Sequence, residues 1–179
     1  SWPSRRTLSV AQDLYDRYKV TTYPRTDSQY LPTDMKEKVN EIIETLGGIE
    51  AYATHVDRLQ NEGLRNTDRN FNDAKVSDHF AIIPTGKLPT SALSKDEQRL
   101  YNMIVRNFIA SWYGEAVIEK QKRTANLGGE IFNKEAQQYT TLGWREVVTK
   151  NLSHPEGWGS YSTESPLASI SSYEWNEEK

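Results

Sequence analysis

The segment 22–28 (sequence TYPRTDS) brings together side chains that suit phosphate chemistry. Tyr23 carries a hydroxyl that can attack phosphorus once its proton has an acceptor. Arg25 presents a rigid fork of N–H donors that matches two phosphate oxygens. Pro24 fixes a non-helical backbone beside the tyrosine, and residues two apart in extended chain point to the same side. We therefore expect Tyr23 and Arg25 to face one site.

The same segment has a simpler interpretation, a turn in which Tyr23 packs and Arg25 pairs with Asp27. A second segment, 77–85 (sequence SDHFAIIPT), places His79 ahead of a short apolar run. A lone histidine in such a place is typically a packed or surface residue, although imidazole also serves in catalytic sites. The two segments together indicate a functional site more strongly than either does alone.

Together the segments resemble the type IA DNA topoisomerases, in particular the topoisomerase III branch. The resemblance covers about residues 4–150. The residues that carry it match in order and approximate spacing, and they are Arg6-Thr7-Leu8, Ala11-Gln12, Leu14-Tyr15, 23–28 (YPRTDS), 30–32 (YLP), His79, 81–85 (AIIPT) and Gly143-Trp144. The last dipeptide resembles the point where family members return to the sheet behind the active-site domain.

This resemblance implies three catalytic residues. Tyr23 would attack a backbone phosphate of single-stranded DNA and form a 5′-phosphotyrosyl link, which leaves a free 3′-hydroxyl. The energy of the broken bond stays in the new one, so resealing after strand passage needs no ATP. Arg25 would stabilise the charge that builds on the pentacovalent phosphate. His79 would contact the DNA or organise the site.

The chain also contains candidates for DNA contact around these residues. Lys19 and Lys75 are expected to bind phosphates, and Ser28 is a third DNA-binding candidate. Ser28, like Thr26 and Asp27, is also expected to hold the loop of the tyrosine segment. Unpaired bases stack on exposed aromatic rings. Tyr30 and Phe80 are therefore candidates for stacking, with packing in the core as the alternative for each.

Metal binding is expected outside this chain. The family's Mg²⁺ site is an acidic cluster in an N-terminal Toprim domain, which also supplies a glutamate and a lysine beside the scissile phosphate. No Asp-x-Asp-x-Glu pattern occurs in the 179 residues. The chain therefore resembles a central fragment of a topoisomerase, inactive by itself, whose Mg²⁺ ligands would lie in the Toprim domain of the full-length enzyme.

The resemblance also implies a domain organisation and partners. Residues 1–114 would form the cap domain that carries the tyrosine, residues 115–150 strands of the arch domain, and residues 151–179 an irregular or partly disordered tail. The expected partners are single-stranded DNA, the Toprim and remaining domains of the same protein, and a helicase.

Composition excludes several other classes of protein. Without a single cysteine, the chain has no disulfide scaffold, thiolate zinc site or cysteine nucleophile. The formal net charge is −3, but the residues from Asn151 onward carry −4, which leaves +1 for residues 1–150. The rest of the chain can therefore carry a local basic surface. No apolar run approaches the roughly 20 residues of a membrane span. We therefore expect no membrane partner and a cytoplasmic, nucleoid-associated location.

Hydrophobic spacing predicts helices first and strands after. Apolar residues at spacings of three and four predict helices, and Ser94 with Glu97 forms a capping-box pattern at the start of one of them. The predicted helices cover 5–18, 34–46, 49–59 and 94–114, with a polar loop over 60–75. Strand patterns cover 117–127, 130–136 and 144–148. The predicted fold class is α+β, a mainly helical cap followed by a few antiparallel strands of an arch-like sheet.

Two other functions can be compared with the sequence. A non-catalytic DNA-binding or structural module could share this architecture without a reactive tyrosine. A metal-dependent relaxase also uses a tyrosine for nicking, but it requires a histidine cluster at a metal. The spacing of His55, His79 and His154 does not match such a cluster.

Overall fold

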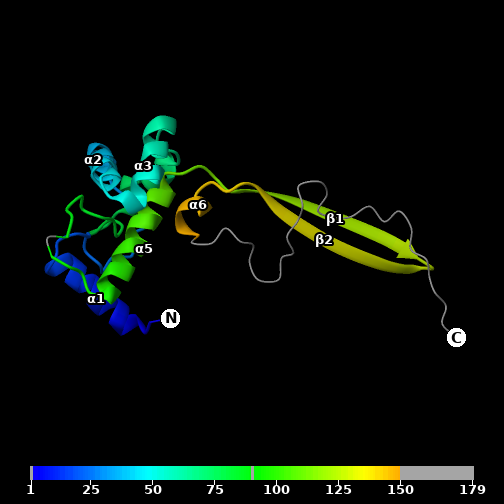
Figure 1. Ribbon diagram of the computed structural model, residues 1–179, viewed down its shortest axis with the longest axis horizontal. Helices are drawn as coiled ribbons and strands as arrows, with labels where there is room; N and C mark the ends of the chain where they lie inside the picture. Colours follow the sequence, from blue (N-terminus) through cyan, green and yellow to red (C-terminus); the bar gives the residue numbers. More distant parts are fainter. Residues whose placement is uncertain (1, 90, 150–179) are drawn as a thin grey trace. The chain divides into compact units, whose positions relative to one another are not determined.

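Helices are the main secondary structure of the chain, in a computed structural model that describes residues 2–89 and 91–149 (Figure 1). The longer helices are α1 (Ser4–Asp16), α2 (Lys36–Gly47), α3 (Glu50–Glu62) and α5 (Lys95–Ser111). The shorter ones are the 3-10 turns η1 (Thr33–Met35) and η2 (Asp73–Lys75) and the α-helices α4 (Thr67–Asn70) and α6 (Arg145–Val148). The four predicted helices are confirmed, and α4 and η2 lie in the predicted loop. Within the described ranges, no helix combines the length and hydrophobicity that a membrane span requires.

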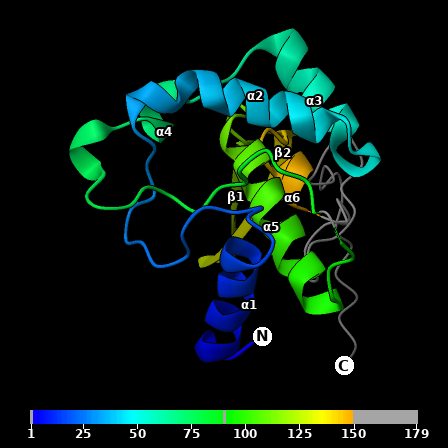
Figure 2. The same ribbon diagram turned by 90° about the vertical axis from the view of Figure 1, so that its left-hand side faces the viewer.

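The chain divides into two compact units. The helical unit comprises Ser1–Gly114 together with Gly143–Lys150, and the described part of the other unit is Glu115–Leu142. Within the helical unit, α2 packs against α3, and α5 packs against both α1 and α6. Figure 2 shows α2 and α3 side by side, with α1 next to α5. The assignment of the two units to cap and arch domains stays a prediction.

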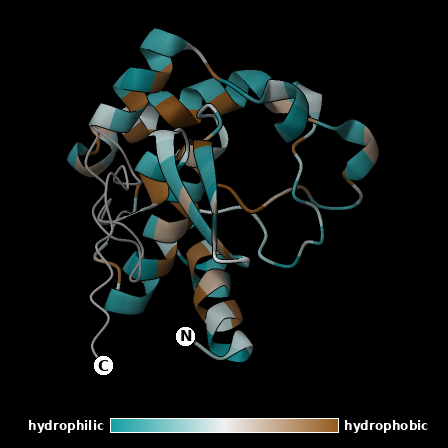
Figure 3. Cartoon of the chain, turned by 90° about the vertical axis from the view of Figure 1, so that its right-hand side faces the viewer, coloured by the Kyte–Doolittle hydropathy of each residue, from teal (hydrophilic) through white to brown (hydrophobic). Residues whose placement is uncertain are grey.

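The core of the helical unit draws residues from distant parts of the chain. Trp112 is fully buried just after α5, and its ring lies 5.4 Å from that of Phe71 and 6.0 Å from that of Phe108, measured between centroids. Hydrophobic and hydrophilic residues alternate along α1 (Figure 3), which buries Ala11 and Leu14. This core anchors the end of α1 and therefore the segment that follows it.

The start of α5 is fixed by the predicted capping box. The Ser94 hydroxyl accepts a hydrogen bond from the backbone N–H of Glu97, and the Glu97 carboxylate accepts one from the backbone N–H of Ser94 at 2.7 Å. The Tyr18 hydroxyl also donates to Glu97 at 3.1 Å. Because Tyr18 lies just beyond α1, these bonds join the end of α1 to the start of α5.

The same bonds lead to a prediction about pH. The pKa of Glu97 is held below its ordinary value, chiefly because the backbone N–H of Ser94 donates to the carboxylate. Such a carboxyl group stabilises the fold above its unfolded pKa, about 4.3, and the stabilisation is lost as the pH falls through the lower folded pKa. We expect Glu97→Gln to lower the free energy of unfolding at neutral pH. The difference from the unmodified chain should shrink below about pH 4.

Urea unfolding at about pH 7, 5, 4 and 3 would measure this difference. Glu44→Gln makes the same chemical change at an exposed position of α2 and should change the free energy by no more than about 0.5 kcal/mol. An effect of Glu97→Gln that is equal at all four pH values would contradict the prediction.

The second unit is a β-hairpin. Strands β1 (Val117–Leu127) and β2 (Glu130–Thr141) pair antiparallel, with Leu127 opposite Glu130 at the turn and Val117 opposite Thr141 at the open end. Gly128 and Gly129 have φ of 61° and 93°, the positive values that a tight two-residue hairpin turn requires and glycine adopts freely. The helical unit and this antiparallel pair confirm the α+β fold class.

The predicted third strand over 144–148 is wrong. The segment forms the short helix α6, in which Val147 is fully buried. Arg106 on α5 donates from Nη1 to the Val147 carbonyl oxygen at 2.7 Å. Packing against α5 therefore overrides the strand preference of the two adjacent valines, which is a weak and context-dependent preference.

Candidate active site around Tyr23

The two sequence segments lie side by side in the helical unit. Backbone hydrogen bonds join Thr22 N to Ile83 O at 2.9 Å and Thr85 N to Val20 O at 3.1 Å. The Thr22 hydroxyl donates to Ala81 O at 3.0 Å and accepts from Ile83 N at 2.9 Å. Because Pro84 and Val20 are also buried, the backbone that leads into Tyr23 is held firmly against the 81–85 segment.

Tyr23 lies in a cluster of aromatic rings. Its ring is half-buried, with the centroid 4.4 Å from that of His79 and 5.3 Å from that of Tyr15. The Tyr15 ring meets it nearly edge to face, at 77°, a favourable aromatic geometry. Lys19 places its ammonium group 5.2 Å from the Tyr15 centroid. The cluster restricts the Tyr23 ring to one orientation.

The Tyr23 hydroxyl makes no hydrogen bond to another of the described residues. This oxygen is not among the buried polar atoms that lack a partner in the described residues, so it is open to solution and available to a substrate. Of the predicted catalytic residues, the structure brings Tyr23 and His79 into contact. His79 is itself exposed, so both rings can be reached from solution.

Arg25 is exposed beyond a bend of the chain at Pro24. It makes no hydrogen bond, ion pair or ring contact with the residues that the structure describes, and so it forms no ion pair with Asp27. The simpler interpretation, in which Arg25 pairs with Asp27, therefore does not hold in this structure. The guanidinium is left available to an anionic ligand.

The three predicted DNA-binding residues have different surroundings. Ser28 donates its hydroxyl to Lys75 O at 2.9 Å and accepts from Tyr30 N at 3.1 Å, so it holds the loop. Lys75 is exposed, donates from Nζ to the Tyr30 hydroxyl at 3.0 Å and lies 4.7 Å from the centroid of that ring. Lys19 is exposed and has a φ of 57°. The two lysines, unlike Ser28, present positive charge to solution.

The two candidate stacking residues are both half-buried. Phe80 packs against the hydrophobic core. This packing is the alternative to base stacking that the sequence leaves open for Phe80. Tyr30 is covered by Lys75. The residue that sequence reasoning missed is Tyr15, whose helical spacing indicates only a core position; no signal in the sequence shows that its ring packs against Tyr23.

No metal centre is found among residues 2–89 and 91–149, because they contain no group of three or more potential ligands from His, Asp and Glu side chains. The Nδ1 atom of His55 lies 3.2 Å from the Tyr113 hydroxyl oxygen. Burial lowers the pKa of the His55 imidazole. His154 lies outside the described residues.

Taken together, a tyrosine fixed beside a histidine and an exposed arginine is a site suited to phosphoryl transfer. A family model described as DNA topoisomerase matches residues 1–172, and the chain belongs to the DNA topoisomerase family. Within this family the resemblance to type IA enzymes of the topoisomerase III branch is confirmed.

Bacterial DNA topoisomerases 3 are similar to this chain in sequence. The chain is 39% identical over 145 residues to DNA topoisomerase 3 of Bacillus licheniformis, and 38% identical over 145 residues to that of Bacillus subtilis. It is 36% identical over 150 residues to DNA topoisomerase 3 of Shouchella clausii. These matches cover 80–83% of the chain but 20% of each relative, so the chain spans about a fifth of their length.

Proposed function

We propose that this chain supplies the nucleophile of a type IA, topoisomerase III-like DNA topoisomerase. In the full-length protein, Tyr23 attacks a backbone phosphate of single-stranded DNA. The observation that carries this proposal is the position of Tyr23, whose ring is fixed between Tyr15 and His79 while its hydroxyl has no hydrogen-bond partner among the described residues. A nucleophile must be both oriented and free in this way.

The proposed step exchanges one phosphodiester for another. A bond forms between the Tyr23 oxygen and phosphorus, the bond from phosphorus to the 3′-oxygen breaks, and the proton lost by the phenol is balanced by the proton gained at the 3′-oxygen. Arg25 stabilises the negative charge on the non-bridging oxygens in the transition state. The reverse reaction reseals the strand without ATP after another strand has passed.

The remaining parts of the full-length protein belong to the same proposal. Single-stranded DNA is the substrate, and a Toprim domain carries the Mg²⁺ that the reaction uses. Mg²⁺ prefers several oxygen ligands in octahedral geometry, and no cluster of three potential ligands occurs in the described ranges.

The polarity of the covalent link tests the proposal. Full-length protein would be mixed with a single-stranded oligonucleotide labelled at either its 5′ or its 3′ end, and then denatured. Because Tyr23 is proposed to hold the 5′-phosphate of the downstream piece, we expect the 3′ label to migrate with the protein on a denaturing gel. The 5′ label should appear on a shorter, free oligonucleotide.

The other results would each overturn a part of the proposal. A 5′ label on the protein would show the opposite polarity. The absence of any adduct, under conditions in which the protein binds the oligonucleotide, would support the alternative of a non-catalytic DNA-binding or structural module derived from the same architecture.

A further inference from the structure

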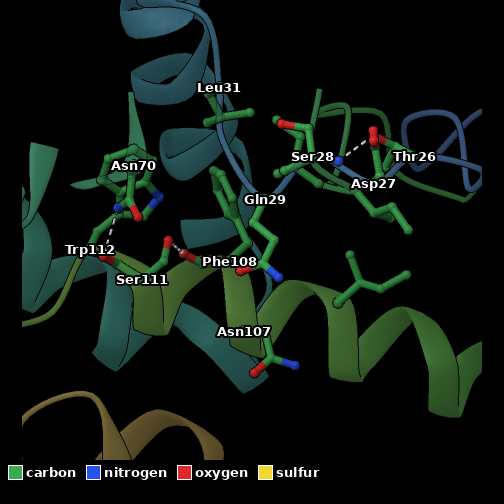
Figure 4. Close-up of a pocket in the computed structure, with 14 residues that line it drawn as sticks. Thr26, Asp27, Ser28, Gln29, Leu31, Asn70, Asn107, Phe108, Ser111 and Trp112 are labelled. Carbon is green, nitrogen blue, oxygen red and sulfur yellow. Dashed lines mark hydrogen bonds between the residues drawn. The ribbon is translucent and has the colours of Figure 1, made fainter. Parts of the chain in front are cut away.

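A pocket of about 450 Å³ adjoins the tyrosine segment within the helical unit. One side is formed by the residues that follow Arg25, from Thr26 to Leu31, and the opposite side by α5 with Asn107, Phe108 and Ser111 (Figure 4). Its volume falls in the range of sites for small molecules. Neither Tyr23 nor His79 lines it, so the pocket is separate from the aromatic cluster.

Most residues of the loop after Arg25 line the pocket, and they are Thr26, Asp27, Ser28, Gln29 and Leu31. Thr26 and Ser28 donate their hydroxyls to His79 O at 3.0 Å and Lys75 O at 2.9 Å. These bonds hold the loop against the segment 75–79. The loop that carries the tyrosine therefore also forms one wall of the pocket.

The polar groups of the pocket have unused hydrogen-bonding capacity. Asp27 and Gln29 are exposed and make no hydrogen bond through their side chains to another described residue. Trp112 lines the pocket and is fully buried, yet its indole Nε1 has no hydrogen-bond partner in the part of the chain that the structure describes. That nitrogen is enclosed by the protein, so Asp27 and Gln29 supply the polar groups that a ligand in the pocket can reach.

The apolar part of the lining suits a flat ring. Phe108, Leu31 and Ile83 are buried side chains that contribute to the pocket. Apolar surfaces with a few polar groups at the edge are typical of sites that bind nucleobases and other planar ligands. A base removed from its stack would lose contact with its neighbours, and the apolar lining would replace that contact.

We propose that this pocket binds an unpaired guanine of the single-stranded DNA near the scissile phosphate. The guanine site rests on the proposed function, in which Tyr23 attacks that phosphate. A carboxylate is an acceptor only, and guanine presents two adjacent N–H donors, at N1 and N2, that can pair with both oxygens of Asp27. Adenine, cytosine and thymine each offer a single donor group, so none of them presents two adjacent N–H groups to a carboxylate. Guanine also offers acceptors at O6 and N7, one of which can accept a hydrogen bond from the exposed Gln29 amide.

The position of the pocket limits which nucleotide can enter it. Asp27 is four residues after Tyr23, and four residues of fully extended chain span at most about 14 Å. Bases along one strand are spaced by about 3.4 Å in a duplex and by more in an extended single strand. The bound guanine must therefore lie within a few nucleotides of the phosphate that Tyr23 attacks.

Two measurements on the full-length protein test the proposal. In the first, a single guanine is moved along an otherwise all-thymine oligonucleotide, and the cleavage sites are mapped. We expect cleavage about 10-fold above that of the all-thymine strand when the guanine lies at one fixed distance from the cut, because a good bidentate contact discriminates bases by about this factor. The second measurement uses Tyr23→Phe protein, which cannot cleave. This protein should bind the guanine-containing strand about 10-fold more tightly than the all-thymine strand.

Three variants test whether the pocket itself carries the guanine preference. Asp27→Asn should reduce the preference to about 2-fold, and Asn107→Trp, which fills the pocket from the exposed face of α5, should abolish it. Asp57→Asn makes the same change as the first variant at an exposed position of α3 and should leave the preference intact.

Each outcome bears on one proposal or on both. A guanine preference in binding that disappears in Asp27→Asn and Asn107→Trp supports the pocket even if no strand is cleaved, which would overturn only the proposed function. Cleavage without base preference, or a preference that both pocket variants retain, overturns the guanine site and leaves the proposed function standing. A fixed preference for another base that the pocket variants abolish would overturn the assignment of guanine.

Discussion

Tyr23→Phe is expected to abolish covalent capture of single-stranded DNA by the full-length protein. The substitution removes only the hydroxyl oxygen that forms the bond to phosphorus. The phenylalanine ring keeps the contacts that the Tyr23 ring makes with Tyr15 and His79. No hydrogen bond to a described residue is lost. The fold and the affinity for DNA should therefore change little, while the adduct on a denaturing gel falls below detection.

Tyr15→Phe is the matched control for this experiment. Tyr15 is the nearest other phenol, its ring lies 5.3 Å from that of Tyr23, and the variant keeps the ring contact. It should form the adduct at close to the normal level. If Tyr23→Phe still forms an adduct and Tyr15→Phe does not, the nucleophile is Tyr15. An adduct in both variants would point to a tyrosine elsewhere in the full-length protein.

Arg25→Ala is expected to slow cleavage by about 100- to 1,000-fold while weakening DNA binding by less than about 10-fold. Removing one preorganised donor to a transition-state oxyanion typically has an effect of this size on the rate. Arg25 is exposed and has no side-chain partner among the described residues, so its removal leaves no buried charge behind. Single-turnover cleavage rates at saturating DNA, compared with equilibrium binding, would separate the two effects.

Two further variants serve as controls for Arg25→Ala. Arg5→Ala removes another exposed arginine, from the first turn of α1, and should leave the cleavage rate unchanged. Arg25→Lys keeps the charge but loses the planar fork of donors, so it should restore only part of the rate. Equal losses in binding and in cleavage for Arg25→Ala would show that the residue only binds DNA.

The secondary structure was predictable where short-range physics decides it. The capping box of Ser94 and Glu97 is complete within four residues, and it starts α5 as the sequence indicates. Gly128-Gly129 supplies the two positive φ angles of the hairpin turn, so β1 and β2 follow from local chemistry. The segment 144–148 was not predictable in this way, because its conformation depends on α5, with which Arg106 and the buried Val147 connect it.

The candidate residues of the site were predictable for a different reason. Tyr23, Arg25 and His79 were found because their residue types suit phosphate chemistry and their motifs resemble a family, neither of which requires coordinates. The expectation that Tyr23 and Arg25 face one site rested on extended backbone between them. The bend at Pro24 breaks that regularity, and the two side chains form no hydrogen bond or cation–π contact with each other.

By itself, the sequence determined the helices and the hairpin, the fold class and the family, because residue type and spacing a few positions apart are enough for each. Only the tertiary structure decided that Tyr15 and His79 pack against Tyr23, that Arg25 forms no ion pair with Asp27, and that α5 and the loop after Arg25 line one pocket. These features join segments as far apart as Thr22 and Ala81, 59 positions along the chain. Contacts at such separation depend on how the whole core packs, which no local pattern encodes.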